Sequence, residues 1–253
     1  MGVPPSTTRT VRGHYQHGDT LLGTTLEPRL LQVVYTVRNA PVHDVVDLRR
    51  AFTTLKARLA QFLTPADGVT FNFLAETDQA FFYYLRGVRL ESLVHADAPD
   101  PRHMALTLRL QCPDPLWRRR TARAHAVTVS AGAPISEDLS VAVLGSWYAY
   151  PTLTIAGAFT NPRLANAATG EALGLDYTLA GGETVTVTMD PAGTSVASDV
   201  AGDITHTLAE DADLQLLLSP FTSGGANALT LTADALVGDG TVTLGWEDTF
   251  IAL

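Results

Sequence analysis

The second half of the chain repeats short segments of alternating apolar and polar residues, and this repetition constrains the fold more than any other feature. From residue 124 onward the segments recur roughly every 8 to 14 residues, separated by Gly, Asn and Asp turns, with no helical period between them. This rhythm is typical of a β-sandwich or jelly roll. The expected strands are AHAVTVS, DLSVAVLG, PTLTIAGAF, LGLDYTLAG, ETVTVTM, SDVAGDITHTL, DLQLLLSPF, NALTLTAD and GTVTLGWEDTF.

The first half has the only convincing helical pattern. Its apolar residues recur at spacings of three and four and form one narrow stripe, made of Val45, Leu48, Phe52, Leu55, Leu59 and Phe62. Pro41 suits a first helical position, and Thr64-Pro65 is the expected stop. The basic residues Arg49, Arg50, Lys56 and Arg58 lie largely off the stripe, which favours a solvated face over a lumen or partner surface.

Strand patterns flank this helix on both sides. Leu31, Val33, Tyr35 and Val37 alternate before it, and three aromatic and β-branched segments follow at residues 68–76, 80–96 and 102–112. We therefore expect an α+β unit with a mostly antiparallel sheet and one long helix, followed by a galectin-like or jelly-roll-like sandwich. The fold class of the whole chain is mainly β.

Charge is divided unevenly along the chain. Sixteen of the 17 Lys and Arg residues lie in residues 1–123 with 11 acids, whereas residues 124–253 carry Arg163 and 15 acids. The two parts therefore have net charges of +5 and −14, and the change predicts domains at 1–123 and 124–253. The acidic second part would repel phosphate, so its charge opposes nucleic-acid binding.

The segment RLQCPDPLWRRR, residues 109–120, lies at this boundary. Its prolines forbid continuation of a strand, so we interpret it as an interdomain joint with a tryptophan that is at least partly buried. The joint residues are Cys112, Pro113, Asp114, Pro115 and Trp117. We expect Arg118, Arg119 and Arg120 to pair with acids of a neighbouring domain or subunit rather than with phosphate.

Several residues invite a chemical interpretation that their context does not favour. Cys112 would need His103 or His125 nearby to act as a nucleophile, and a Pro-Asp-Pro turn supplies neither a base nor a helix N-terminus. A transition-metal site is conceivable at His14, His17, His43 and Asp44, but surface or ring-contact histidines are the favoured interpretation. A calcium site or a glycosidase pair is conceivable at Asp199, Asp203, Glu210, Asp211 and Asp213, but a solvated acidic surface is favoured.

Motifs of other enzyme classes are missing from the sequence. It has no Walker or Rossmann glycine loop and no Gly-x-Ser-x-Gly elbow. A single cysteine excludes an internal disulfide and a cysteine-based zinc site. No secretory h-region is visible, and no apolar run approaches the ~18 residues of a spanning helix. We expect a soluble, non-enzymatic protein without a cofactor.

The order of these parts resembles that of the distal tail proteins of long-tailed siphophages. The matching pieces are the early GDTLLGTTLEPRLLQVVYTV, the helix that contains DLRRAF, and LQCPDPLWR at the end of the first domain. In the second domain they are YPTLTIAG, NPRLANAATGEAL, GGETVTVTMDP, SGGANALTLTA and TVTLGWEDTF. Together the pieces cover nearly the whole chain. The short second domain contains no obvious inserted binding module.

The resemblance implies a structural hub at the virion tail tip, made in the host cytoplasm. N-terminal domains would form a hexameric ring with outward-facing C-terminal sandwiches, and the ring would join the tail tube to the tail-tip or receptor-binding assembly. The implied partners are the tail tube protein, the tail-tip protein, the tape measure protein and receptor-binding proteins or side fibres. DNA would only pass through the lumen, and no membrane is involved. Arg49 and Arg50, with Arg118 to Arg120, are the candidate subunit or lumen contacts.

The alternative interpretation is a carbohydrate-binding or adhesion module, which would require an exposed aromatic platform. The second half offers Trp147, Tyr148, Tyr150, Tyr177 and Trp246 for such a platform. Trp246 lies in an alternating strand and is expected to face the core.

Overall fold

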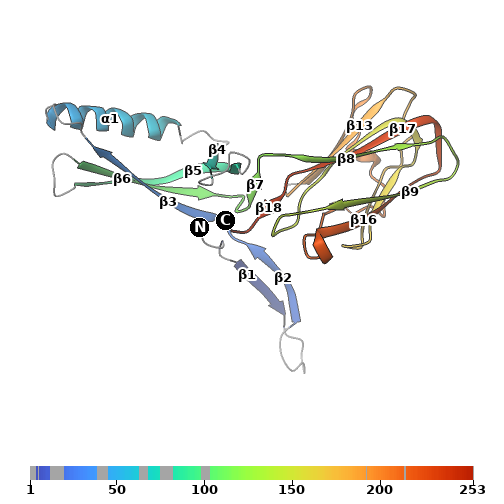
Figure 1. The fold of residues 1–253 in the computed structure, drawn as a ribbon, viewed down its shortest axis with the longest axis horizontal. Helices are drawn as coiled ribbons and strands as arrows, with labels where there is room; N and C mark the ends of the chain where they lie inside the picture. Colours follow the sequence, from blue (N-terminus) through green and yellow to red (C-terminus); the bar gives the residue numbers. More distant parts are fainter. Residues whose placement is uncertain are drawn as a thin grey trace. The chain divides into compact units, whose positions relative to one another are not determined.

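The structure is a computed structural model (Figure 1), and it describes most of the chain. The described residues are 4, 6–11, 20–38, 45–62, 68–74, 82–97, 103–191, 193–213 and 215–252. Two compact units are present: Met1–Trp117 together with Ile251–Leu253, and Arg118–Phe250. The packing thus divides after residue 117, whereas the change in charge led us to expect a boundary after residue 123.

The first unit contains one described helix and a set of antiparallel strands. Strands β1 and β2 form a two-stranded sheet of their own, and the main sheet has the order β5-β6-β3, with β4 pairing with β5. Next to β5 the main sheet continues with β7, whose first residue, Trp117, is the last of this unit. The elements are β1 (Ser6–Val11), β2 (Thr20–Leu26), β3 (Arg29–Arg38), α1 (Val45–Phe62), β4 (Val69–Leu74), β5 (Phe82–Asp97), β6 (His103–Cys112) and β7 (Trp117–Arg119).

The predicted alternation determines which face of the main sheet is buried. In β6 the side chains of Leu106, Leu108, Leu110 and Cys112 are buried, whereas those of Arg109 and Gln111 between them are exposed. A strand directs successive side chains to opposite faces, so one face of the sheet forms a core and the other faces solvent. The same register gives β3 a solvent face with Leu30, Gln32 and Val34.

Helix α1 begins and ends at the two ends of the predicted apolar stripe, Val45 and Phe62. Side chains 53–58 are exposed, including Lys56 and Arg58, and Leu59 is half-buried. The expected capping prolines, Pro41 and Pro65, lie outside the described residues. No helix in the described part of the chain is long and apolar enough to cross a membrane.

The second unit is an antiparallel β-sandwich. One sheet has the order β15-β14-β13-β10-β17-β8 and the other β12-β11-β16-β9. The elements are β8 (Arg123–Val129), β9 (Ile135–Ala142), β10 (Thr152–Thr160), β11 (Arg163–Asn166), β12 (Glu171–Gly174), β13 (Thr184–Asp190), β14 (Gly193–Ser198), β15 (Gly202–Asp203), β16 (Ala226–Ala233), β17 (Ala235–Trp246) and β18 (Thr249–Phe250), with 3-10 turns at Thr205–Thr207 and Ser223–Gly225.

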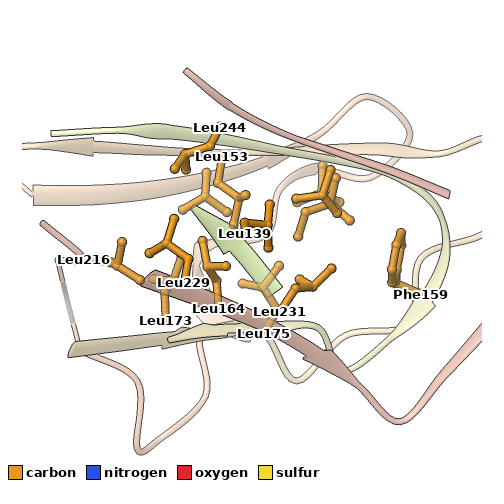
Figure 2. Close-up of a cluster of buried hydrophobic side chains, with 14 of the residues drawn as sticks. Leu139, Leu153, Phe159, Leu164, Leu173, Leu175, Leu216, Leu229, Leu231 and Leu244 are labelled. Carbon is orange, nitrogen blue, oxygen red and sulfur yellow. The ribbon is translucent and has the colours of Figure 1, made fainter. Parts of the chain in front are cut away.

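One continuous apolar core fills the space between these two sheets. Figure 2 shows Leu153 of β10 and Leu244 of β17 facing Leu164 of β11 and Leu229 of β16. Each comes from the buried half of an alternating strand, so the sandwich follows directly from the two-residue period. The mainly β fold class, with one long helix in the first half and a sandwich in the second, is confirmed.

Two predicted strands of the second half are largely irregular, because side chains take much of the place of a neighbouring strand. Segment 213–221 buries Leu216 and Leu218 alternately, as expected. However, its only strand-like pairing among the described residues is an isolated bridge between Leu218 and Ala149, and the backbone of Leu217 and Ser219 bonds to the Asn166, Glu171 and Asn227 side chains. Segment 198–208 keeps only the two-residue strand β15 between turns. In these turns the Ser198 hydroxyl accepts from Val200 and Ala201, and the Asp203 carboxylate accepts from Thr205.

A third predicted strand, 173–181, is shortened. Only its first two residues belong to β12, and isolated bridges from Leu175 to Leu208 and from Thr178 to Thr160 hold the rest. Strands β11 and β14 were not predicted. The strand prediction thus failed mainly in segments where polar side chains bond to the backbone.

Candidate functional site

The joint between the units begins where β6 ends. Cys112 is the last residue of β6, and Pro113, which has no backbone N–H, follows it. The Leu116 N–H donates to the Asp114 carboxylate at 3.2 Å, which closes a turn around Pro115. Cys112 and Trp117 on either side of this turn are fully buried, and for Trp117 at least partial burial was predicted.

Arg29 is the central residue of the joint on the side of the first unit. It opens β3 but is only 3% exposed. Its Nε donates to the Pro115 carbonyl at 2.9 Å, its Nη2 donates to the Ile251 carbonyl, and its guanidinium lies 5.6 Å from the Trp117 ring centroid. Arg29 therefore links β3, the proline turn and the returning segment at Ile251 through one buried cation.

Neither Arg29 nor Ile251 was predicted as part of the joint. Arg29 lies in the segment EPRLLQ, at the start of an apolar strand, but no neighbouring residue in the sequence indicates which groups accept its hydrogen bonds. Those acceptors are 86 and 222 residues away along the chain. The sequence therefore indicated that Arg29 is buried, but it did not indicate which carbonyl groups it binds.

The environment of Cys112 is that of a structural thiol. Burial raises its pKa to about 11, despite an opposing effect of the Arg29 charge. At neutral pH the thiol therefore stays protonated, whereas a nucleophilic cysteine needs a lowered pKa. Of the two histidines considered as its base, the His103 side chain lies outside the described residues, and His125 belongs to the second unit.

The basic segment pairs with acids that lie 129 residues further along the chain, inside the second unit. Arg118 Nη1 lies 4.0 Å from Glu247 Oε2, and Arg119 Nη1 lies 4.0 Å from Asp248 Oδ2. The Arg119 N–H donates to the Asp248 carbonyl at 2.9 Å. These contacts hold the chain's entry into the second unit against its exit.

Asp248 connects this pair of segments to a third one. It is fully buried, and its Oδ1 accepts the Leu144 N–H at 3.0 Å, while Oδ2 lies 3.9 Å from Arg123 Nη1. Arg120 is exposed. Arg49 and Arg50 lie in α1, but their side chains are outside the described part of the structure.

The acidic residues of the predicted surface cluster have separate structural roles. Asp199 accepts the Thr184 N–H, Asp213 accepts the Ala172 N–H, and Asp211 pairs with Arg163 through contacts of 2.7 and 2.8 Å. The Arg163 hydrogen bond lowers the pKa of Asp211. No group of three His, Cys, Asp or Glu residues gathers within the described ranges, and His14, His17, His43 and Asp44 lie outside them.

The aromatic residues of the second unit do not form a flat platform. Trp246 is buried in the core, as expected, and the Tyr177 hydroxyl donates to Glu183. Trp147, Tyr148 and the exposed Phe221 pack edge to face with interplanar angles of 77° to 89°. This mutual packing favours a structural cluster over stacking against a sugar ring.

Comparisons with known proteins identify the fold of the chain. No family model and no curated protein matches the sequence. The structure is similar to that of the SPP1 Dit protein (gp 19.1), a paradigm of the hub adsorption apparatus in phages that infect Gram-positive bacteria. The similarity has a TM-score of 0.66 at 17% identity and covers 98% of this chain and 90% of that one. A second solved structure is the phage p2 baseplate in its activated conformation with Sr, at a TM-score of 0.36 and 5% identity over 96% and 89% of the chains. The chain thus has the fold of the SPP1 protein.

Proposed function

We propose that this protein is a non-enzymatic structural component of a siphophage-type tail: the distal hub, a hexameric ring that joins the tail tube to the tail-tip or receptor-binding assembly. The fold supports the proposal because the likeness to the SPP1 hub protein extends over nearly the whole chain, both units included. Cys112 is buried and protonated, and the Asp199 and Asp213 carboxylates accept backbone N–H groups. These residues therefore have structural roles, which agrees with a structural protein.

One observation supports the ring: the solvent face of the main sheet in the first unit has large apolar side chains exposed on it, including two on its open edge strand. Leu30 and Val34 of β3 are 63% and 56% exposed, and Val94 of β5 is 55% exposed. Val34 and Val94 both pair with Thr107, so they lie on the same face on either side of it. Large exposed side chains grouped in this way mark an interaction surface.

The open edge of the sheet beside this face also favours contact with another copy of the chain. β3 is ten residues long and ends the sheet, pairing only with β6 within the part of the chain that the structure describes. A long open edge with apolar side chains promotes association between chains. A head-to-tail contact between such edges uses a different surface on each copy, and a closed ring of copies leaves no edge unpaired.

Mass measurement and negative-stain imaging of the purified protein test this proposal. Six copies of a 27.0 kDa chain would have a mass of about 162 kDa and give a sixfold ring in class averages. Val34→Asp places a charge on the exposed face without disturbing the core, so it should shift the mass to that of a single chain. Val200→Asp, at a valine 72% exposed in the second unit, is the matched control and should leave the ring intact.

Two results would contradict the proposal. A wild-type protein that stays monomeric up to millimolar concentration, both alone and after mixing with its tail-tube neighbour, would refute the ring. A ring that persists in Val34→Asp with unchanged mass would instead refute the assigned surface.

A further inference from the structure

The sandwich of the second unit has four sheet edges, and two of them are closed by the chain itself. On the β15 side, the Ile204 N–H donates to the Val196 carbonyl, and the Val196 N–H donates to the Thr205 hydroxyl, both at 2.9 Å. On the β12 side, the Ala209 N–H donates to the Gly174 carbonyl at 3.0 Å, and Asp213 bonds to Ala172 in both directions. Neither edge offers a free run of backbone groups.

The third edge, β9, carries charge. Glu137 and Asp138 are adjacent and exposed, so one carboxylate stands on each face of the strand. Charged side chains on an edge strand oppose the addition of another strand. The Ala142 carbonyl at the end of β9 is also taken, since it accepts from Arg123 Nη1 at 2.9 Å.

The fourth edge, β8, has none of these protections in the residues that the structure describes. Its seven residues, RAHAVTV, pair only with β17. The side chains on its outer face are small, exposed and uncharged: Ala124, Ala126 and Thr128. In an antiparallel pair every second residue directs its N–H and C=O away from the partner. β8 therefore presents an accessible row of donors and acceptors.

The charge around this edge differs from that of the rest of the sandwich. Of the five Lys and Arg residues in Arg118–Phe250, four lie at Arg118–Arg123, directly before and at the start of β8. Arg118, Arg119 and Arg123 lie beside Glu247 or Asp248, so four bases and two acids leave this end with a net charge of +2, while the unit as a whole is strongly acidic. His125 follows two residues into the strand, half-buried between the layers. A partner with carboxylates near this end would be attracted, and a basic partner would not.

We propose that the outer edge of β8 is a strand-addition site for an extended, acidic segment of another protein. The segment would complete the backbone hydrogen bonds of β8 and lay β-branched or aromatic side chains over Ala124 and Ala126. Its carboxylates would lie toward the Arg120–His125 end. A second copy of β8 is the poorer partner, because this strand contains no acid. The site is on the other unit from the proposed ring surface and does not depend on it.

Hydrogen–deuterium exchange of the full chain tests the site with two synthetic probes. The acidic probe is the capped heptapeptide TVEVEVT, and the basic probe is its lysine twin, TVKVKVT. At a peptide concentration of about 1 mM, typical for weak association, the acidic probe should slow exchange in residues 123–129 and leave 135–142 and 171–174 unchanged. The basic probe should slow it less.

A pair of variants locates the bound strand. Ala126→Glu puts a carboxylate beside the added strand, so it should weaken the acidic probe about two- to fivefold and strengthen the basic one. Thr241→Glu is the matched control: Thr241 is exposed on β17 and pairs with Thr128, one strand further from the edge. Thr241→Glu should change the affinity for the acidic probe and for the basic probe less than Ala126→Glu does.

Three outcomes would overturn the proposal. They are no protection of 123–129 by either probe, equal protection of 135–142, and equal binding of the acidic and basic probes to the wild-type chain. These comparisons use the wild-type protein, so they decide the matter even where Ala126→Glu unfolds. Mass measurement on the same samples reports the ring separately.

Discussion

Replacing Trp117 by alanine should remove a large part of the stability of the first unit. Trp117 is fully buried, and removal of a core aromatic ring destabilises a domain by about 3–5 kcal/mol. The Arg29 guanidinium, 5.6 Å from the ring centroid, would also lose a cation–π contact of about 0.5–2 kcal/mol. We therefore expect a loss of about 3.5–7 kcal/mol, against a typical domain stability of about 5–15 kcal/mol.

Calorimetry of the full chain measures this loss, with hydrogen exchange to assign each transition to a unit. Trp117→Phe is the control, because it keeps an aromatic face for Arg29 and should lose clearly less. The second unit has its own core, so amides of Leu153 and Leu244 should keep their protection in both variants. A loss below about 1 kcal/mol in Trp117→Ala, within the range of a surface substitution, would refute the reasoning.

Three further changes follow from other contacts. Cys112→Ala should cost only about 1 kcal/mol and leave the mass of the assembly unchanged. The native wild-type thiol should react with iodoacetamide far more slowly than the urea-unfolded one, because it is buried with a pKa of about 11; fast native alkylation would contradict this. Asn227→Ala should destabilise the second unit by about 3 kcal/mol, since Asn227 bonds to the N–H and the carbonyl of Ser219, which would be left buried and unpaired. Calorimetry should show almost no change for its control, Thr230→Ala, which loses a surface bond to Asp138. Burial raises the pKa of Glu183, but hydrogen bonds from Ser198, the Ala180 N–H and Tyr177 outweigh it, so the pKa lies below its usual value. The stability that Glu183 contributes is therefore present above about pH 4.3 and lost as the pH falls through the lowered folded-state pKa. Urea midpoints between pH 7 and 3 should decline less steeply in Glu183→Gln; an identical acid profile would contradict the assignment.

Local patterns in the sequence predicted the regular parts of the fold and failed where a side chain replaces a strand. The stripe from Val45 to Phe62 located α1 because a helix depends on neighbours three and four residues apart. Segment 213–221 has the alternation of a strand, yet Asn166 and Asn227 take its backbone bonds. An alternating pattern cannot show whether the backbone of a segment bonds to a neighbouring strand or to asparagine side chains.

The joint was predicted in part for the same reason. Prolines report local geometry, so the turn after Cys112 and the burial of Trp117 could be inferred from adjacent residues. The acceptors of Arg29 and the acids that pair with Arg118 and Arg119 lie far along the chain. Such pairings are products of the topology, and an unaligned sequence contains no local trace of them.

The bond from Arg29 to Ile251 also has a consequence for the order of events during synthesis. Residues 118–250 form a compact unit whose core lies within that span, so its sandwich can fold as soon as it leaves the ribosome. The first unit is made earlier but lacks one of its Arg29 acceptors until residue 251 has emerged. We therefore expect the first unit, although it is made first, to mature only when the whole sandwich has also been made, and chains interrupted within the sandwich to present an incomplete Arg29 site.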